Sequence, residues 1–199
     1  MRGVMNVVEE LGASILAANE IATEDIPAEG RDFVEFWSLD LLRDEANAIL
    51  ANRSYETGKS MFEVAACVQC HTMRGEGKDL GPDLTSVRHR YSALNVLEHI
   101  LNPSLLVAEE YRTYVIETEW DGTYYGQIIS QDNKTVTVLS NPLAPETAVT
   151  LQRSDIQSLE SMNASPMPMD LLITLEKEEI WDLVAYILSG DDANDPAFK

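Results

Sequence analysis

Two cysteines and a histidine stand together in the segment Cys67-Val68-Gln69-Cys70-His71. This C-x-x-C-H spacing is typical of covalent c-type haem attachment, in which each thiol forms a thioether with a haem vinyl group. The adjacent histidine is then held beneath the iron as its proximal axial ligand. Because the sequence has no other cysteine, we predict one covalent haem on Cys67 and Cys70, with His71 on the iron.

Two other uses of a C-x-x-C pair fit the sequence less well. A zinc site would need two further Cys or His residues at ligand spacing, and we interpret His89 and His99, ten residues apart, as surface or core residues and not as ligands. A thioredoxin-type pair would follow a buried strand and open a helix. Here residues 57–66 before the motif predict a helix, and residues 72–77 after it predict a loop.

The second iron ligand is expected in a proline-containing segment near the C-terminal end of the sequence. Met167 lies between Pro166 and Pro168, and prolines stiffen a loop that must hold a side chain in place. A methionine thioether on the iron, opposite a histidine, raises the reduction potential. Met162 and Met169 are alternative ligands in the same part of the sequence.

Helices are predicted on both sides of these ligands. Apolar residues at helical spacing indicate an amphipathic helix at the C-terminal end, from Leu171 to Ile187. A strong amphipathic helix is predicted over residues 31–51. Residues 1–30 predict a helix and a linker, which we interpret as the remnant of a longer protein.

Between the two halves of the predicted haem domain, the pattern changes to a period of two residues, which indicates strands. Tyr114, Ile116 and Thr118 alternate with their neighbours, and Asp121-Gly122 is a hairpin turn signal. Four or five short strands between about residues 111 and 160 predict a small antiparallel barrel or sandwich, similar in order to an Sm-type barrel.

The composition is strongly acidic, with 14 Lys and Arg against 34 Asp and Glu, a formal net charge of −20. Such a charge repels nucleic acid and anionic lipid, and it favours a redox partner with a basic docking patch. No apolar run approaches the length of a membrane span. The acidic start lacks the features of a signal peptide, so we expect a mature form or a domain excised from a longer secreted protein.

With these motifs, the chain resembles the haem-binding cytochrome c domains found at the C-terminal ends of large secreted proteins of planctomycetes and verrucomicrobia. The chain departs from that family at Ser86 and Arg88, where a small Gly-x-Gly is usual, and at Glu109-Glu110, where Pro-Gly is usual. The shared features are the helix start Gly58 to Phe62, the CVQCH site, GPDLT at residues 81–85, ILNPS at 100–104, Tyr111 to Tyr114, the β segment, Met167-Pro168 and the last helix.

The resemblance implies a mainly α class I cytochrome c fold interrupted by the β insertion, α+β overall. It implies that the Pro82 carbonyl accepts the other imidazole N–H of His71, and that Arg90 binds a haem propionate. It also implies a close crossing of the helix at Gly58 and Phe62 with the last helix.

The expected organisation is an N-terminal helix and linker (1–30), the first part of the cytochrome domain (31–110), the β-domain (111–160) and the second part (161–199). The predicted function is electron transfer outside the cytoplasm, in the periplasm or beyond, without an enzymatic activity of its own. The alternatives are a haem sensor or peroxidase-like site with a labile methionine, and an interaction module that acts through the β insertion. We interpret the insertion either as a docking surface or as a haem cover, and expect that replacing residues 113–157 with a short linker preserves Met-ligated haem binding.

Overall fold

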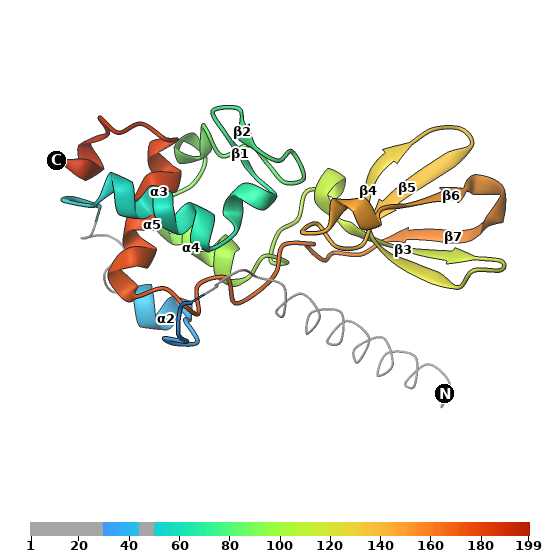
Figure 1. The fold of residues 1–199 in the computed structure, drawn as a ribbon, viewed down its shortest axis with the longest axis horizontal. Coiled ribbons are helices and arrows are strands. Elements are labelled where there is room, and N and C mark those ends of the chain that lie inside the picture. The colour runs from blue at the N-terminus through green and yellow to red at the C-terminus, as the bar shows by residue number, and fades with distance from the viewer. Residues whose placement is uncertain (1–29, 44–49) are drawn as a thin grey trace.

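The computed structural model describes residues 30–43 and 50–199. They form a helical part and a five-stranded sheet, which lie next to each other along the long axis of the molecule (Figure 1). We call residues 30–43, 50–112 and 162–199 the α-domain, and residues 113–161 the β-domain. The β-domain is therefore inserted between the two halves of the α-domain, and the described residues have an α+β fold.

Among the described residues, every helix longer than one turn lies in the α-domain. No helix in this described part is long and apolar enough to cross a membrane. Its elements are α2 (Leu39–Leu42), α3 (Tyr55–Val64), η2 (Cys67–Gln69), the paired strands β1 (Thr72–Met73) and β2 (Glu76–Gly77), η3 (Val87–His89), α4 (Ala93–Leu101), η4 (Glu109–Tyr111), α5 (Lys177–Ser189) and η7 (Pro196–Phe198), where η denotes a 3-10 helix.

Side-chain caps fix where these helices begin. Ser54 accepts a hydrogen bond from the amide of Thr57 at 3.1 Å at the start of α3. Ser92 and Asn95 form a reciprocal capping box at the start of α4, with bonds of 3.3 and 3.2 Å. Each cap satisfies backbone N–H groups that have no partner within the helix.

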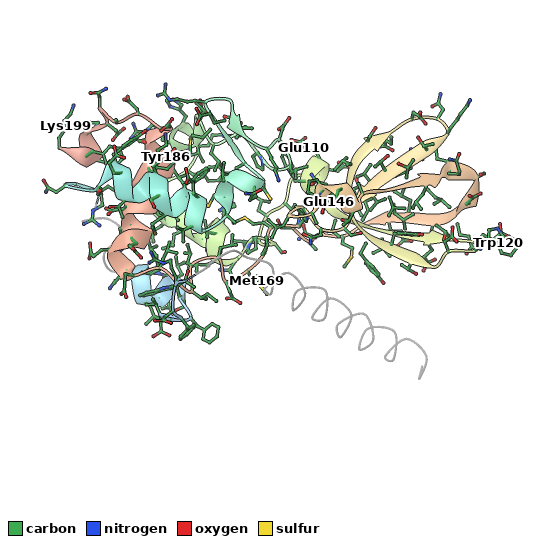
Figure 2. The ribbon with its side chains drawn as sticks, in the orientation of Figure 1. Glu110, Trp120, Glu146, Met169, Tyr186 and Lys199 are labelled. Atoms are coloured by element: carbon green, nitrogen blue, oxygen red, sulfur yellow. The ribbon has the colours of Figure 1, made fainter. Side chains whose placement is uncertain are left out.

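Helices α3 and α5 cross in close contact, and Gly58 is the residue that permits it. A Cβ atom at Gly58 would lie 2.3 Å from the carbonyl oxygen of Asp182 and 2.7 Å from the Cβ of Tyr186. One turn along α3, the ring of Phe62 packs against that of Tyr186 with centroids 5.5 Å apart, and Figure 2 labels Tyr186 on α5 beside α3. The crossing implied by the family resemblance is therefore confirmed.

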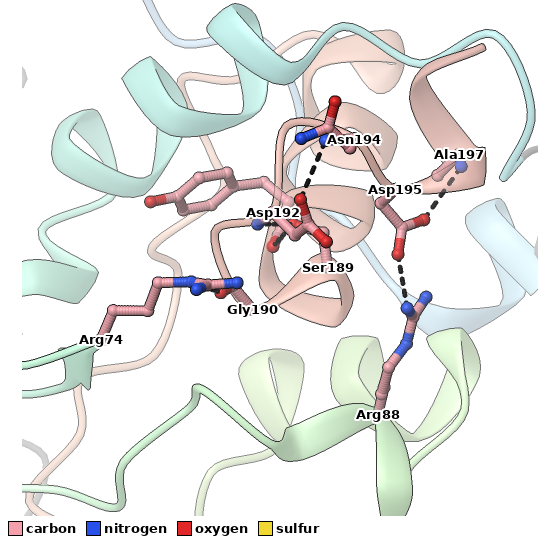
Figure 3. Close-up of polar contacts among 9 residues, drawn as sticks. Arg74, Arg88, Ser189, Gly190, Asp192, Asn194, Asp195 and Ala197 are labelled. Carbon is pink, nitrogen blue, oxygen red and sulfur yellow. Dashed lines mark hydrogen bonds and ion pairs between the residues drawn. The ribbon is translucent and has the colours of Figure 1, made fainter.

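Polar contacts hold the C-terminal segment against the rest of the α-domain (Figure 3). The guanidinium of Arg74 donates to the carbonyl oxygen of Gly190 at 2.7 Å, where Gly190 ends α5 with a left-handed φ of 62°. The buried carboxylate of Asp195 pairs with Arg88 and accepts from the amide of Ala197 at 2.9 Å, which caps η7.

The predicted helix over residues 31–51 is wrong in its first part. Residues 31–38 are not helical, and α2 is only one turn long. The amide of Val34 donates to the carbonyl of Ile173 at 2.8 Å, and the indole of Trp37 donates to the carbonyl of Leu175 at 3.1 Å. These contacts with the segment before α5 replace helical hydrogen bonds, so tertiary structure overrides the local apolar pattern.

Two further predictions fall outside the described residues. They are the helix and linker predicted for residues 1–30, except Gly30, and the part of the leading helix at residues 44–49.

The β-domain is a single antiparallel sheet with the strand order β6-β5-β4-β3-β7. Its two edges are β6 and β7, and no closed barrel is found, so the predicted barrel or sandwich is not confirmed. The strands are β3 (Thr113–Thr118), β4 (Thr123–Gln131), β5 (Thr135–Leu139), β6 (Val149–Gln152) and β7 (Ile156–Ser161), with η5 (Pro145–Thr147) and η6 (Arg153–Asp155) between them.

The period-two pattern places one face of β3 in the core of the β-domain, as predicted. Ile116 is fully buried and packs with Val136, Val138 and Leu151. The hairpin between β3 and β4 turns at Gly122, whose φ is 90°. The predicted strands and first turn are therefore confirmed.

The two chain crossings between the domains lie next to each other. The amide of Thr113 donates to the carbonyl of Ala164 at 2.9 Å, and the amide of Met162 donates to the carbonyl of Thr113 at 2.8 Å. The segments that enter and leave the β-domain are therefore hydrogen-bonded to each other.

Candidate haem site

The C-x-x-C-H motif follows directly after α3. Ala66 has a left-handed backbone, with φ of 56°, and this residue turns the chain into η2. The amides of Cys70 and His71 both donate to the carbonyl oxygen of Cys67, at 3.1 and 2.9 Å. One short turn of backbone thus fixes the two thiols and the imidazole relative to one another.

Both thiols are in environments that keep them protonated. Burial raises the pKa of Cys67 to about 12. Burial also raises the pKa of Cys70, and the positive charge of Lys78 opposes that effect. Thiolates are the form that binds zinc or acts as a nucleophile, so these sulfur atoms fit neutral thioethers better than either of those roles.

The ring of His71 is oriented by the loop that contains Gly81 and Pro82. His71 Nδ1 lies 2.8 Å from the carbonyl oxygen of Pro82, and this oxygen can only accept, so Nδ1 carries the proton. Burial lowers the pKa of His71, and the hydrogen bond to Pro82 opposes that effect. The neutral ring therefore leaves the lone pair of Nε2 free for a metal ion, as second-shell contacts commonly arrange.

The loop itself is held close to the motif. The amides of Leu80 and Gly81 both donate to the carbonyl oxygen of Cys70, at 3.0 and 2.7 Å. A Cβ atom at Gly81 would lie 2.9 Å from Cε1 of the His71 ring. The absence of a side chain at Gly81 is therefore what lets the loop pass along the imidazole.

A cavity of roughly 680 Å³ brings the motif together with the C-terminal methionine segment. Cys67, Cys70, His71 and Met167 all line it, although Met167 lies 96 residues after His71 in the sequence. The volume lies within the ~300–1,000 Å³ typical of small-molecule and cofactor sites.

Met167 is placed in the cavity by a loop without regular secondary structure. Its amide donates to the hydroxyl oxygen of Ser165 at 3.1 Å. Of the three candidate methionines, all of them in the described part of the chain, Met167 alone lines the cavity. Met169 is 45% exposed, and Figure 2 shows it at the edge of the α-domain. Its place in the cavity therefore favours Met167 over Met162 and Met169 as the candidate for the second iron ligand.

Arg90 also lines the cavity, and its guanidinium carbon lies 5.9 Å from the centre of the Tyr91 ring. Its contact with a propionate stays a prediction. The ring of His99 also packs against Tyr91, with ring centroids 5.1 Å apart, and His99 lines the cavity too. His89 is exposed on η3.

The β-domain supplies part of the cavity wall. Gln127 on β4 and Pro142, after β5, line the cavity, and both are buried. Nothing in the sequence indicates this role, because a lone glutamine on a strand has no recognisable motif. Of the two interpretations of the insertion, this position favours the haem cover over the docking surface.

The residues of the cavity fit a c-type haem. Two neutral sulfur atoms, an imidazole with a free Nε2 and a thioether line one cavity, and the protein atoms around them are mostly apolar. By contrast, within the described residues no group of three or more His, Cys, Asp or Glu side chains could hold a metal ion by itself. The donors present are those of haem ligation and not those of a zinc site.

Comparison with protein families agrees with this chemistry. Residues 55–109 match the family model of Cytochrome c. The match begins at α3, includes the attachment motif and the Gly81–Pro82 loop, and ends after α4. It supports a class I cytochrome c-like domain, for which covalently bound haem c is the implied cofactor and haem-based electron transfer the general function. No curated protein matches the chain.

The matched part of the cytochrome c domain does not include Met167 or the β-domain. The structure brings both to the same cavity as the matched residues. The second half of the site is thus contributed by segments that lie outside the family match.

Proposed function

We propose that this protein is a monohaem c-type cytochrome that transfers electrons, with His71 and Met167 as the axial ligands of a haem attached to Cys67 and Cys70. The observation that carries the proposal is that these four side chains, from two distant segments, line one cavity. The planctomycete and verrucomicrobial type of cytochrome domain is the one that the motifs and the β insertion favour.

Each of these residues has one role in the proposal. Cys67 and Cys70 tether the cofactor, and the Pro82 carbonyl holds His71 with Nε2 toward the cavity. Met167 contributes a soft sulfur ligand, which favours the reduced state compared with a second histidine. Arg90 balances the charge of a propionate. When bound, the haem supplies one-electron oxidation and reduction at its iron.

The partner and location belong to the same proposal. A net charge of −20 favours a redox partner with a basic docking patch. Covalent haem attachment takes place outside the bacterial cytoplasm, so we propose a periplasmic or otherwise extracytoplasmic location. We propose an electron carrier without an enzymatic activity of its own.

The visible absorption spectrum of the protein, produced together with haem-maturation machinery, tests this function. We expect a low-spin spectrum in both oxidation states and, in the ferric form, the weak band at the red end that marks methionine on iron. Reversible reduction and oxidation should follow. A high-spin ferric spectrum without that band would instead support the sensor or peroxidase-like alternative.

A further inference from the structure

Gln127 is the polar side chain that reaches the cavity from the β-domain. It lies on β4, is 5% exposed and lines the same cavity as His71 and Met167. Its Nε2 donates to the carbonyl oxygen of Leu80 at 3.0 Å, a residue 47 positions earlier in the sequence. Its Oε1 is buried and has no partner among the described residues.

The orientation of this amide follows from its partner. The carbonyl oxygen of Leu80 can only accept a hydrogen bond, so the NH₂ end of Gln127 must face it. The oxygen end of Gln127 is then directed elsewhere, and a buried acceptor of this kind is commonly satisfied by an ordered water. The contact with Leu80 therefore requires a side chain at position 127 that donates a hydrogen bond.

Leu80 connects Gln127 to the proximal histidine. The amide of Gly81 belongs to the same peptide unit as the Leu80 carbonyl, and it donates to the carbonyl of Cys70 at 2.7 Å. This one peptide unit is therefore held on one side by the motif and on the other by Gln127. Two residues later, the carbonyl of Pro82 accepts from Nδ1 of His71. The loop that orients His71 is thus fixed from both domains.

We propose that Gln127 is a positioning residue, through which the inserted β-domain holds the Leu80–Pro82 loop and thereby the hydrogen bond between Pro82 and His71. A strong hydrogen bond to Pro82 makes the imidazole more basic, and a more basic ligand stabilises ferric iron. The β-domain then influences the reduction potential without contributing an iron ligand. This inference rests on the proposed function for its consequence, but the contact itself does not depend on haem.

The variant that tests it is Gln127→Met, which keeps the length of the side chain and removes the donor. We expect the Nδ1 proton of His71 to exchange with solvent several-fold faster in the variant, as measured by NMR, and the reduction potential to rise. The matched control is Gln131→Met on the same strand. Gln131 is exposed and bonds to Arg153, so both quantities should equal those of the parent protein.

Equal exchange of the His71 Nδ1 proton in Gln127→Met and the parent protein would overturn the proposal and leave Gln127 as a packing residue. Should the variant not fold, the parent protein still provides a test. One side-chain amide proton of Gln127 should exchange slowly because it is bonded to Leu80, and rapid exchange of both protons would refute the contact.

The mass of the parent protein separates this inference from the proposed function. A protein without covalent haem would reject the cytochrome function, whereas the exchange of the His71 and Gln127 protons would still confirm or refute the contact. A haem-containing protein in which Gln127→Met changes neither the exchange nor the potential would reject the positioning role alone.

Discussion

Met167 depends on local contacts for its place in the cavity, because the residues around it form neither helix nor strand. Its amide bonds to the hydroxyl oxygen of Ser165, and Pro166 and Pro168 restrict the backbone on either side. This is a small set of restraints for a side chain that we propose as an iron ligand. The identity of the side chain at this position should therefore decide the sixth ligand.

We expect Met167→Ala to abolish the spectrum of methionine-ligated iron and to lower the reduction potential, because the thioether favours ferrous iron. Potentiometric titration followed by absorbance measures both effects. Met162→Ala is the control, since Met162 does not line the cavity. A loss of the methionine band in Met162→Ala, with Met167→Ala unchanged, would show that the ligand is assigned to the wrong residue.

Asp195 is a second residue whose effect is testable. Burial raises the pKa of its carboxyl group, but hydrogen bonds from Ala197 and Arg88 outweigh this effect and hold the pKa below its ordinary value. The folded state therefore favours the carboxylate. Its contribution to stability is complete above the unfolded pKa of about 3.9 and is lost as the pH falls through the lower folded pKa.

Asp195→Ala should lower the free energy of unfolding at pH 7 by about 1–3 kcal/mol, since a buried, charge-assisted hydrogen bond and a helix cap are removed. Urea denaturation at a series of pH values measures the difference from the parent protein. We expect that difference to shrink below about pH 4. A difference that is constant from pH 7 to the most acidic pH would contradict the role of the carboxylate.

Site residues that belong to a sequence motif could be predicted, whereas site residues outside any motif could not. The attachment motif and the Pro82 contact follow from spacing and from the family resemblance. Gln127 and His99 line the cavity but carry no signal in the sequence, because their significance arises only when β4 and α4 pack beside the motif. Such contacts depend on tertiary structure and not on neighbouring residues.

At the scale of elements, the crossing of α3 and α5 positions the motif. Helix α3 ends directly before the attachment turn, and α5 contains a continuous run of buried residues, from Ile180 to Ser189. The close approach at Gly58 brings the backbones of α3 and α5 together. Any group added at Gly58 must push the helices apart.

Gly58→Ala should therefore destabilise the protein by about 1–3 kcal/mol, the usual cost of overpacking. Alanine is the better helix former by about 1 kcal/mol, so propensity alone predicts the opposite sign. Thermal or urea denaturation gives the free energy of unfolding. Ser60→Ala, at an exposed position of the same helix, is the control and should be neutral or slightly stabilising. An equal stabilisation by both variants would contradict the close crossing.

The elements also show where local pattern fails. Apolar periodicity predicted the strands of the β-domain and the helix from Lys177 onward, because their buried faces repeat regularly. The first part of the predicted C-terminal helix, residues 171–176, is wrong, because these residues form turns and not a helix. The same pattern predicted a helix from residue 31, yet Phe33 and Phe36 are 56% and 66% exposed. In that segment the backbone bonds to Ile173 instead of to itself, and nothing in the neighbouring residues could indicate so distant a partner.

At the scale of the whole molecule, the β-domain closes the cavity while its far end extends away from the α-domain. Gln127 and Pro142 line the cavity, whereas Trp120, at the hairpin tip, is 80% exposed and lies at the opposite end of the molecule in Figure 2. Only the near end of the β-domain is therefore expected to affect the iron.

We expect replacement of residues 113–157 with a short Gly/Ser linker to lower the reduction potential, because greater exposure of the cavity to water favours the ferric state and this effect outweighs the opposite effect of losing Gln127. Exogenous imidazole should also bind to the ferric protein more tightly than in the parent. Trp120→Ser is the control and should alter neither property. An affinity for imidazole equal to that of the parent protein would restore the interpretation of the β-domain as a separate module.

The measurement that tests the central claim most directly is the intact mass of the protein under denaturing conditions, after production with haem-maturation machinery. One covalent haem should be present, and the mass increase should persist in denaturant because both bonds are thioethers. The double variant with Cys67→Ala and Cys70→Ala should carry none. A parent protein with an unmodified mass, or a haem that denaturant removes, would contradict the account.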